Sequence, residues 1–304
     1  MILTVDIGNS NIVVGLWENE ALIHIGRILT KKDYTVKELI FSLKEQIQEY
    51  ACESVNAYEG AILSSVVPEI TDKVLFALEN ITGTRPLLMG PFLYTGVDVS
   101  DYEQGAIGMD RIVDMSAALA LYGTPVMVCD LGTCTTITVA GVVEANVDDN
   151  AEMIDVNGKK TTNGLCGKIL GGMICPGVQL SLDAEARRAS QLPQLTADNV
   201  GYLLGKDTAS NMLAGAVAGC GMMISELADR LKSGDVTNNA VRAEDGELSV
   251  NRFNDLKVVI TGGLGEVVLP WIKCDAKVHY EQNLLLRGLY EIFICNRSIP
   301  VIQK

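Results

Sequence analysis

Two short polar turns contain the residues of this sequence whose types and spacing best suit chemistry. Each turn places Asp-x-Gly directly after an apolar run, in LTVDIGNSNIVVG at the start of the chain and in VMVCDLGTCTTITVAG further along. Aligning the two copies matches three pairs of positions: Asp6 with Asp130, Gly8 with Gly132, and Asn9 with Thr133. The repeat distance is far too long for a solenoid, so the pattern indicates a domain duplication.

The chemistry that such turns favour is the binding of phosphate. Glycine lets the backbone approach a ligand closely, and exposed N–H groups in a turn form a concavity that binds anions. A carboxylate at the end of a strand can hold a metal ion, directly or through water. Two such turns facing each other would grip a nucleotide polyphosphate between two domains. The alternative is a pair of plain hairpin turns, which fits one copy better than it fits two matched copies.

Other nucleotide-binding motifs are missing from the sequence. It contains no GxxxxGK[ST], which argues against a P-loop protein, and no GxGxxG after the first strand, which argues against a dinucleotide fold. A later turn, Thr261-Gly262-Gly263, also follows an apolar run. It suits either close approach of the backbone to an adenine or ribose, or a tight strand-to-helix connection.

Apolar periodicity and turn residues predict the elements that would position these turns. At the start, three strands separated by polar turns predict an antiparallel meander over 2–6, 12–17 and 21–28. The next predicted elements are a helix over 36–50, a strand over 60–65 and a helix over about 110–122. The second half is predicted to begin with the second strand–turn–strand, followed by a polar loop or insertion over 143–168 and helices over most of 178–232. After a surface loop over about 233–255, we expect strands over 257–263 and 276–280 and a helix over about 283–295.

Composition limits the classes of function. The 304 residues carry a formal net charge of −14, which disfavours binding to nucleic acid or to anionic membranes. We see neither a bilayer-spanning apolar run nor the start of a signal peptide, and we expect a cytoplasmic protein. The eight cysteines form no CxxC pair. They suit reduced core positions better than metal ligands, because only His24 and His279 could join them.

The motifs resemble those of a known family. The paired turns are similar to those of the sugar kinase, heat-shock chaperone and actin superfamily, and within it the chain resembles the type III pantothenate kinases almost from end to end. Segments that follow the family's order are DIGNSNIVVG, ILSSVVP, GMDRI, DLGTCTT, LGGMICPG, GKDT…AGAVAG, VVITGG and LLLRGLYEIFICN. The resemblance implies an α/β fold of two duplicated actin-like (ribonuclease H-like) domains with mixed sheets flanked by helices. We place the domains at 1–121 and 122–304.

The resemblance also implies an activity. The chain would transfer the γ-phosphoryl group of ATP to pantothenate, giving 4'-phosphopantothenate in the first step of coenzyme A biosynthesis. Mg²⁺ and a monovalent cation, K⁺ or NH₄⁺, would be required. The family is dimeric and binds pantothenate near the subunit interface, so we expect a homodimer.

Roles for individual residues follow from the same resemblance. Asp110 would be the base that takes the hydroxyl proton, Arg111 would orient the substrate, and Asp130 would hold the monovalent cation. The ATP loop would comprise Asp6, Ile7, Gly8, Asn9, Ser10, Asn11, Ile12 and Val13, with Thr133 as a further ATP contact. The pantothenate site would comprise Tyr102, Gly108, Met109, Asp110, Arg111 and the position of Ala189. From the residues alone, Asp110 and Arg111 also suit an ordinary helix-start carboxylate and a surface cation.

Two positions depart from the family's pattern, and the stretch between Thr138 and Gly171 is longer than usual. Thr138 stands where the family usually has a second Asp, and Ala189 stands where it has a Thr that contacts pantothenate. The family's usual Pro is also missing before GMDR. These changes leave two alternatives open. The chain could be a non-catalytic or regulatory relative with the same fold, or a kinase for another small hydroxyl substrate.

Overall fold

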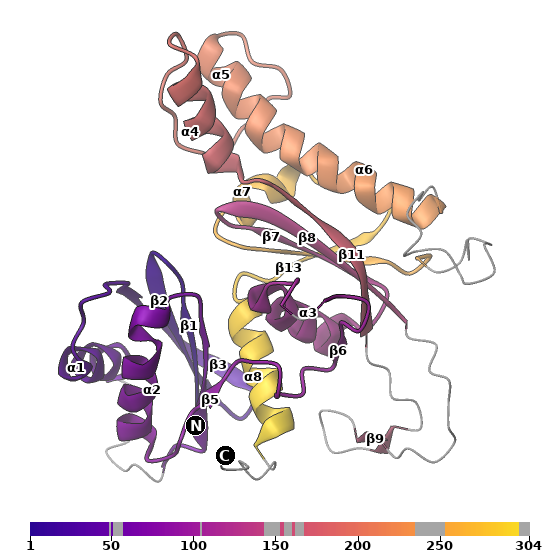
Figure 1. Ribbon diagram of the computed structural model, residues 1–304. Helices are drawn as coiled ribbons and strands as arrows, with labels where there is room; N and C mark the ends of the chain where they lie inside the picture. The colour runs from indigo at the N-terminus through magenta and orange to yellow at the C-terminus, as the bar shows by residue number, and fades with distance from the viewer. Residues whose placement is uncertain are drawn as a thin grey trace.

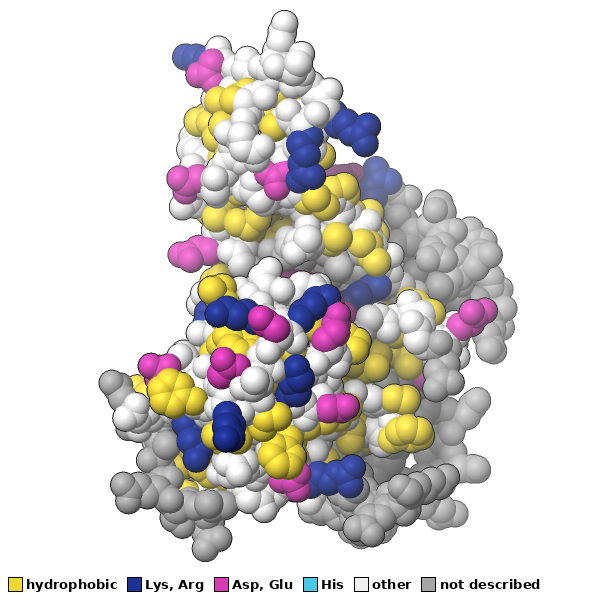
Figure 2. Space-filling model, turned by 60° about the vertical axis from the view of Figure 1, so that its left-hand side comes forward, with side chains coloured by type: hydrophobic (Ala, Val, Ile, Leu, Met, Phe, Trp, Pro, Cys, Tyr) yellow, Lys and Arg dark blue, Asp and Glu magenta, His cyan; other side chains and the backbone are white. Residues whose placement is uncertain are grey.

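The fold consists of two halves, each built around a mixed β-sheet (Figure 1). The computed structural model describes residues 1–48, 50, 57–103, 105–142, 153–154, 160–161, 167–234 and 253–297. On the face shown in Figure 2, basic and acidic side chains are interspersed over the lower half of the molecule, and hydrophobic side chains are visible in both halves. The lower half contains the N-terminal sheet.

The first sheet has five strands in the order β3-β2-β1-β4-β5. Their bounds are β1 Ile2–Ile7, β2 Asn11–Glu18, β3 Ala21–Leu29, β4 Gly60–Ser65 and β5 Leu87–Leu88. The first three strands pair antiparallel, which confirms the predicted meander, and β4 pairs parallel with β1.

Two helices cover one face of this sheet, α1 (Val36–Ile47) and α2 (Pro68–Thr82). A capping box starts α1, because the Thr35 side chain accepts from the Glu38 N–H while the Glu38 carboxylate accepts from the Thr35 N–H. The predicted helix over 36–50 is too long, since α1 ends at Ile47.

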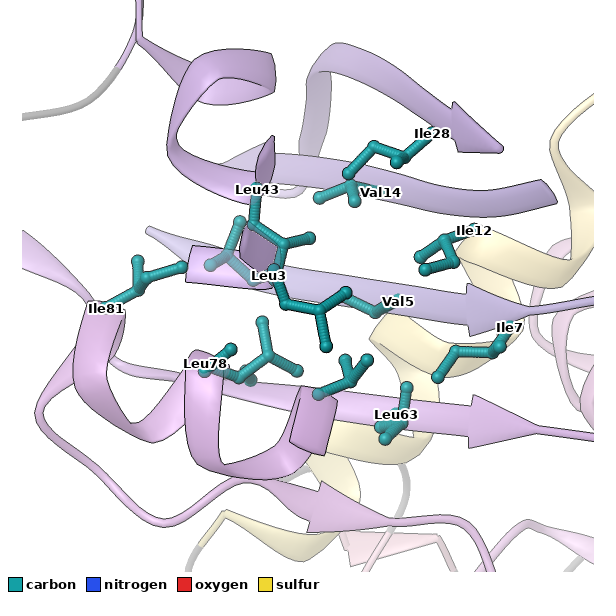
Figure 3. Packing of buried hydrophobic residues seen from close by; sticks show 14 of the residues in the cluster. Leu3, Val5, Ile7, Ile12, Val14, Ile28, Leu43, Leu63, Leu78 and Ile81 are labelled. Atoms are coloured by element: carbon teal, nitrogen blue, oxygen red, sulfur yellow. The ribbon is translucent and has the colours of Figure 1, made fainter. Parts of the chain in front are cut away.

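The first core lies between this sheet and its two helices. In Figure 3, side chains from β1, β2 and β4 point toward those of α1 and α2. Ile7 and Ile12, which flank the first Asp-x-Gly turn, are both fully buried in this cluster. The turn is therefore anchored on both sides by hydrophobic packing.

The second sheet repeats the first. Its order is β13-β12-β7-β8-β11-β6. The bounds are β6 Val97–Asp98, β7 Val126–Leu131, β8 Cys134–Val142, β11 Gly167–Pro176, β12 Lys257–Thr261 and β13 Lys277–Tyr280. In both sheets three antiparallel strands are extended by two parallel ones, so β7 occupies the place of β1. The shared strand order and directions confirm the duplicated α/β fold.

Several predictions in the second half need adjustment. Residues 167–176, within and after the predicted insertion over 143–168, form the long strand β11. Elsewhere in 143–168 only the short paired strands β9 (Met153–Ile154) and β10 (Lys160–Thr161) lie among the described residues. The helical region is interrupted over 189–207, and most of the predicted loop over 233–255 lies outside the described residues.

Helices pack on the outer face of the second sheet (Figure 1). Their bounds are α4 Val178–Arg188, α5 Thr208–Leu213, the π-helical η2 Ala214–Ala218, α6 Gly219–Ser233, α7 Gly265–Val268 and the short 3₁₀ turn η4 Leu269–Trp271. The continuous stretch Thr208–Ser233 is long and apolar enough to cross a bilayer. However, Val217, Ile224 and Ala228 from this stretch are fully buried in the second core, as expected for a core helix.

Two helices join the halves. Helix α3 (Met109–Tyr122) packs on the second sheet, and α8 (Leu284–Asn296), at the other end of the described chain, packs on the first. They lie side by side (Figure 1), and Gly288 of α8 is so close to α3 that a Cβ there would overlap the Val113 carbonyl. The predicted boundary between residues 121 and 122 falls before the last residue of α3 and stays a prediction.

Candidate active site

The two Asp-x-Gly turns occupy equivalent ends of the two sheets. Asp6 lies near the end of β1 and Asp130 near the end of β7, and each has an antiparallel partner strand on one side and a parallel one on the other. Asp110 lies in the first turn of α3. These three carboxyl groups influence one another electrostatically, since the charges of Asp110 and Asp130 both act on Asp6. The structure thus brings together acids that are far apart in the sequence.

The first turn presents its polar groups to solvent. The Gly8 N–H donates to the Asn11 carbonyl at 2.9 Å, and the Thr30 hydroxyl donates to the Gly8 carbonyl at 2.7 Å. The side chains of Asn9 and Ser10 are exposed. These bonds fix the backbone while leaving two polar side chains at the tip of the turn.

Not every residue of the predicted ATP loop can contact a ligand through its side chain. Ile7 and Ile12 are buried in the first core, and Val13 packs against the cluster that contains α8. These three positions can offer a ligand only backbone groups.

The second turn is one residue shorter than the first. Here the Gly132 N–H donates to the carbonyl of Cys134, two residues on, at 3.1 Å. Thr133 is exposed at the tip. The turn has the same polar character as its counterpart but a tighter path.

Two glycines from other motifs let the chain pack closely against this second turn. A Cβ at Gly177 would overlap the Thr133 carbonyl oxygen. Gly262 has a φ of +88°, and a Cβ there would overlap the Asp130 carboxylate. The predicted Thr261-Gly262-Gly263 turn therefore lies directly beside Asp130, where only glycine fits.

Burial makes the two strand-end carboxylates hard to ionise. The pKa of Asp6 is raised to about 6, chiefly by burial; a hydrogen bond from Ser64 opposes the shift, and the charges of Asp110 and Asp130 add to it. Burial also raises the pKa of Asp130 to about 6, and the charge of Asp110 contributes. Both acids would gain from a bound cation, because a nearby positive charge favours the ionised form.

A fourth acid, Asp114, was not predicted. It lies one helical turn beyond Asp110 and is only 4% exposed, and its Oδ1 has no hydrogen-bond partner among the described residues. Burial raises its pKa well above the usual range, with added effects from Asp130, Asp110 and Asp6 in that order. The four-residue spacing from Asp110 was the available signal, because such residues share a helix face.

Arg111 is held by two uncharged acceptors. Its Nε donates to the Thr138 hydroxyl at 2.9 Å, and its Nη2 donates to the Ile137 carbonyl at 3.2 Å. Gly172 of β11 makes room for the guanidinium, since a Cβ there would overlap it. Thr138 therefore accepts a hydrogen bond from Arg111 without neutralising its charge.

Comparison with known proteins identifies the family. A family model described as type III pantothenate kinase matches residues 2–145 and 164–230. The protein named type III pantothenate kinase of Shouchella clausii is 31% identical over 298 residues, covering 98% of this chain and all of that one. This chain belongs to the type III pantothenate kinase family. The protein of the same name from Agathobacter rectalis is 31% identical over 296 residues and is covered to 96%, as is this chain.

A solved structure shares the fold. The chain named as a Baf family transcriptional activator from Campylobacter jejuni aligns with a TM-score of 0.51 over 96% of each chain. The two sequences are only 16% identical, so this likeness bears on the fold alone.

The remaining positions predicted for the pantothenate site lie in different parts of the second half and of α3. Gly108 caps α3, directly before Met109 and Asp110. Tyr102 and Met109 pack half-buried against the cluster around α3. Ala189 ends α4, a helix of 11 residues that starts beside the second turn and so carries Ala189 roughly 16 Å along its axis. Within one chain, the structure therefore does not bring Ala189 next to Asp110.

The acids of the site suit a cation. Among the described residues, no three His, Cys, Asp or Glu side chains converge tightly enough to form a complete metal site. Asp6, Asp130 and Asp114, whose Oδ1 has no partner, nevertheless act on one another, and no ion pair to a cation is found for them among the described residues. Carboxylate oxygens prefer hard cations, so a metal that brings other ligands, such as phosphate oxygens, would fit here.

Proposed function

We propose that this chain transfers the γ-phosphoryl group of ATP to the hydroxyl group of pantothenate, forming 4'-phosphopantothenate, as the first step of coenzyme A biosynthesis. The observation that carries the proposal is the grouping of three acids. Asp6 and Asp130 come from the two equivalent turns, and Asp110 comes from the start of α3. Family membership over nearly the whole chain supports the same reaction.

In this proposal the nucleotide phosphates lie between the two turns. Backbone N–H groups and the side chains of Asn9, Ser10 and Thr133 bind phosphate oxygens, while Asp6 and Asp130 face the cations. Mg²⁺ and a monovalent cation, K⁺ or NH₄⁺, supply positive charge that offsets the charge of the transferring phosphoryl group. Such positioning and charge stabilisation account for most of the catalysis of phosphoryl transfer.

Asp110 is proposed to accept the proton of the attacking hydroxyl. Two observations support this role: Asp110 lies in the first turn of α3, and its charge acts on both Asp6 and Asp130. Arg111, whose charge is not neutralised by Thr138, would bind an anionic group of the substrate. A carboxylate within hydrogen-bond reach of the hydroxyl is suited to this role.

The test is release of ADP by the purified full-length chain with pantothenate, ATP, Mg²⁺ and K⁺. We expect turnover that Asp110→Asn lowers by roughly 10²–10⁴-fold, the usual contribution of a general base, with ATP binding retained. Asp72→Asn, an exposed helical acid, is the matched control and should be unaffected. Turnover only with another alcohol would indicate a different kinase, and none with any alcohol would indicate a non-catalytic relative.

We further propose that two copies of the chain associate and that the protein is cytoplasmic. The outer end of the second half exposes apolar side chains on α4 and on the loop that follows it. These are Leu180, Tyr202, Leu203 and Leu204, of which Leu204 is 82% exposed. An exposed apolar surface of this kind favours association, and it would place Ala189 close to the partner. Reduced cysteines and the use of ATP favour the cytoplasm.

A further inference from the structure

Behind the second Asp-x-Gly turn, two cysteines and a methionine from two elements lie near one another. The Cys175 thiol of β11 lies 3.8 Å from the Met223 sulfur of α6. The Cys220 thiol, also on α6, lies 4.0 Å from the hydroxyl of Thr135. Thr135 and Cys175 are directly paired residues of β8 and β11, so their side chains share a face of the sheet. Cys220 and Met223 are three residues apart and share a face of the helix.

The helix has a local distortion immediately before this cluster. Residues Ala214–Ala218 form a π-helix, and Cys220 follows two residues later. A π turn adds one residue to the helix, which turns the following side chains by about 100° relative to an uninterrupted α-helix. Such π segments are frequent at functional sites. Here the distortion sets which side chains of α6 face Cys175.

The cluster is not simply core packing. Cys175 and Cys220 are both partly exposed, unlike the fully buried Cys129. Met173, two residues before Cys175 on the same face of β11, is 41% exposed. A small ion could therefore reach the sulfur atoms from solvent, past the flexible Met173 side chain.

The donor set selects one class of ligand. Thiolate and thioether sulfurs are soft donors that prefer Cu(I) and similar ions. Zn²⁺ prefers four N, S or O ligands in a tetrahedron, and the part of the chain that the structure describes has no group of three His, Cys, Asp or Glu suited to a metal. We propose that Cys175, Cys220 and Met223 form a binding site for a soft monovalent cation such as Cu(I).

Binding would exchange protons for the metal without any change of oxidation state. Each cysteine would lose its S–H proton to solvent and keep the electron pair that binds the ion, while Met223 would add a neutral thioether. Burial and the neighbouring Cys175 raise the pKa of the Cys220 thiol, so the metal has to displace a proton there. The proposal does not depend on the kinase reaction.

The experiment is an anaerobic competition titration of the full-length chain with Cu(I) held by the chromophoric chelator bicinchoninate. We expect one tightly held Cu(I) per chain in the wild type. Cys175→Ser and Cys220→Ser should each lower the affinity by more than 100-fold, and Met223→Leu by about tenfold. Cys295→Ser, a partly exposed cysteine on the distant helix α8, is the matched control and should leave the affinity unchanged.

The alternative outcomes are distinct. Unchanged affinity in the Cys175→Ser, Cys220→Ser double variant would overturn the proposal, as would stoichiometry that follows the total number of thiols. X-ray absorption at the copper edge of the wild-type complex provides a second test that needs no variant. Two short and one longer Cu–S distances are expected, and nitrogen or oxygen ligands in their place would overturn the assignment.

Discussion

Asp6 and Asp130 have pKa values of about 6, so both change charge just below neutral pH. They must be ionised to hold cations, and acidification would therefore remove the cation sites. We predict that kcat/KM falls as the pH drops through 6. Because each acid that becomes protonated costs a factor of about ten per pH unit, the loss should approach about 100-fold per pH unit well below both pKa values. The measurement is a pH profile of kcat/KM from pH 5 to 8, which reports groups of the free enzyme.

A comparison with Asp6→Asn separates this effect from titration of the nucleotide. In this variant only Asp130 of the two acids still titrates. The loss of kcat/KM on acidification should therefore depend on one proton and not on two. A wild-type profile that stays flat down to pH 5 would contradict the assignment.

Asp114 leads to a prediction about stability. Its folded pKa is raised, so the folded state holds the proton more tightly than the unfolded state does. The stability gained from this tighter proton binding is fully present below the pKa of Asp114 in the unfolded state, near 3.8. It is lost as the pH rises through the pKa in the folded state. At pH 7.5 without ligands, Asp114→Asn should therefore raise Tm by about 2–4 °C. Asp72→Asn serves as the control in thermal unfolding, and a lower Tm for Asp114→Asn would show that the carboxyl group is stabilising.

Among the acids of the site, the sequence predicted those that belong to the repeated Asp-x-Gly pattern. Asp6 and Asp130 stood out because the same short pattern occurs twice. Asp114 did not, because one Asp within an apolar helix does not show which side chains will surround it. The contact between Thr138 and Arg111 could not be predicted either, since it joins β8 to α3, and sequence spacing does not give distances between elements.

Among the elements, the contact between α3 and α8 depends on a single missing side chain. A Cβ at Gly288 would overlap the Val113 carbonyl, and backbone cannot move aside as a flexible side chain can. We predict that Gly288→Ala destabilises the protein by about 1–3 kcal/mol, the usual cost of overpacking. The measurement is the free energy of unfolding in urea.

Gly215→Ala is the matched control for this prediction. Gly215 is also helical, but no atom lies within 4 Å of the place where its Cβ would be. Alanine there should stabilise the protein by about 0.5–1 kcal/mol, because it has the higher helix propensity. Equal effects of the two substitutions would show that the α3–α8 contact is more tolerant than its geometry suggests.

Element predictions succeeded where turn residues marked both ends. The first three strands match the prediction to within one or two residues at each end, because polar turns separate them. The strand β11 was missed over residues 167–176, since its glycines and its exposure on both faces hide the alternation of a half-buried strand. The non-helical stretch over 189–207 was also missed, although Pro193 and Gly201 lie within it.

For the whole molecule, the exposed apolar end of the second half makes a prediction about assembly. If two chains meet there, Leu204→Glu places a charge in the interface and should yield monomers. Phe76→Glu, a similarly exposed apolar residue on α2 of the first half, is the control and should leave the assembly unchanged. The measurement is the mass in solution by light scattering. A monomeric wild type, or a Leu204→Glu variant of unchanged mass, would refute an interface at this end.

The exchange of α3 and α8 between the halves has a consequence for synthesis of the protein. Trp17, made among the first residues, stacks on Tyr290 with ring centroids 4.5 Å apart and lies beneath Arg287 at 5.6 Å. Part of one face of the first sheet is thus covered by α8, which is synthesised long after the sheet itself. During translation that face stays uncovered while about 280 further residues are added, at 5–20 residues per second. The nascent first half therefore spends on the order of tens of seconds with an apolar surface open to chaperones or to other chains, and docking of α8 is the event that closes it.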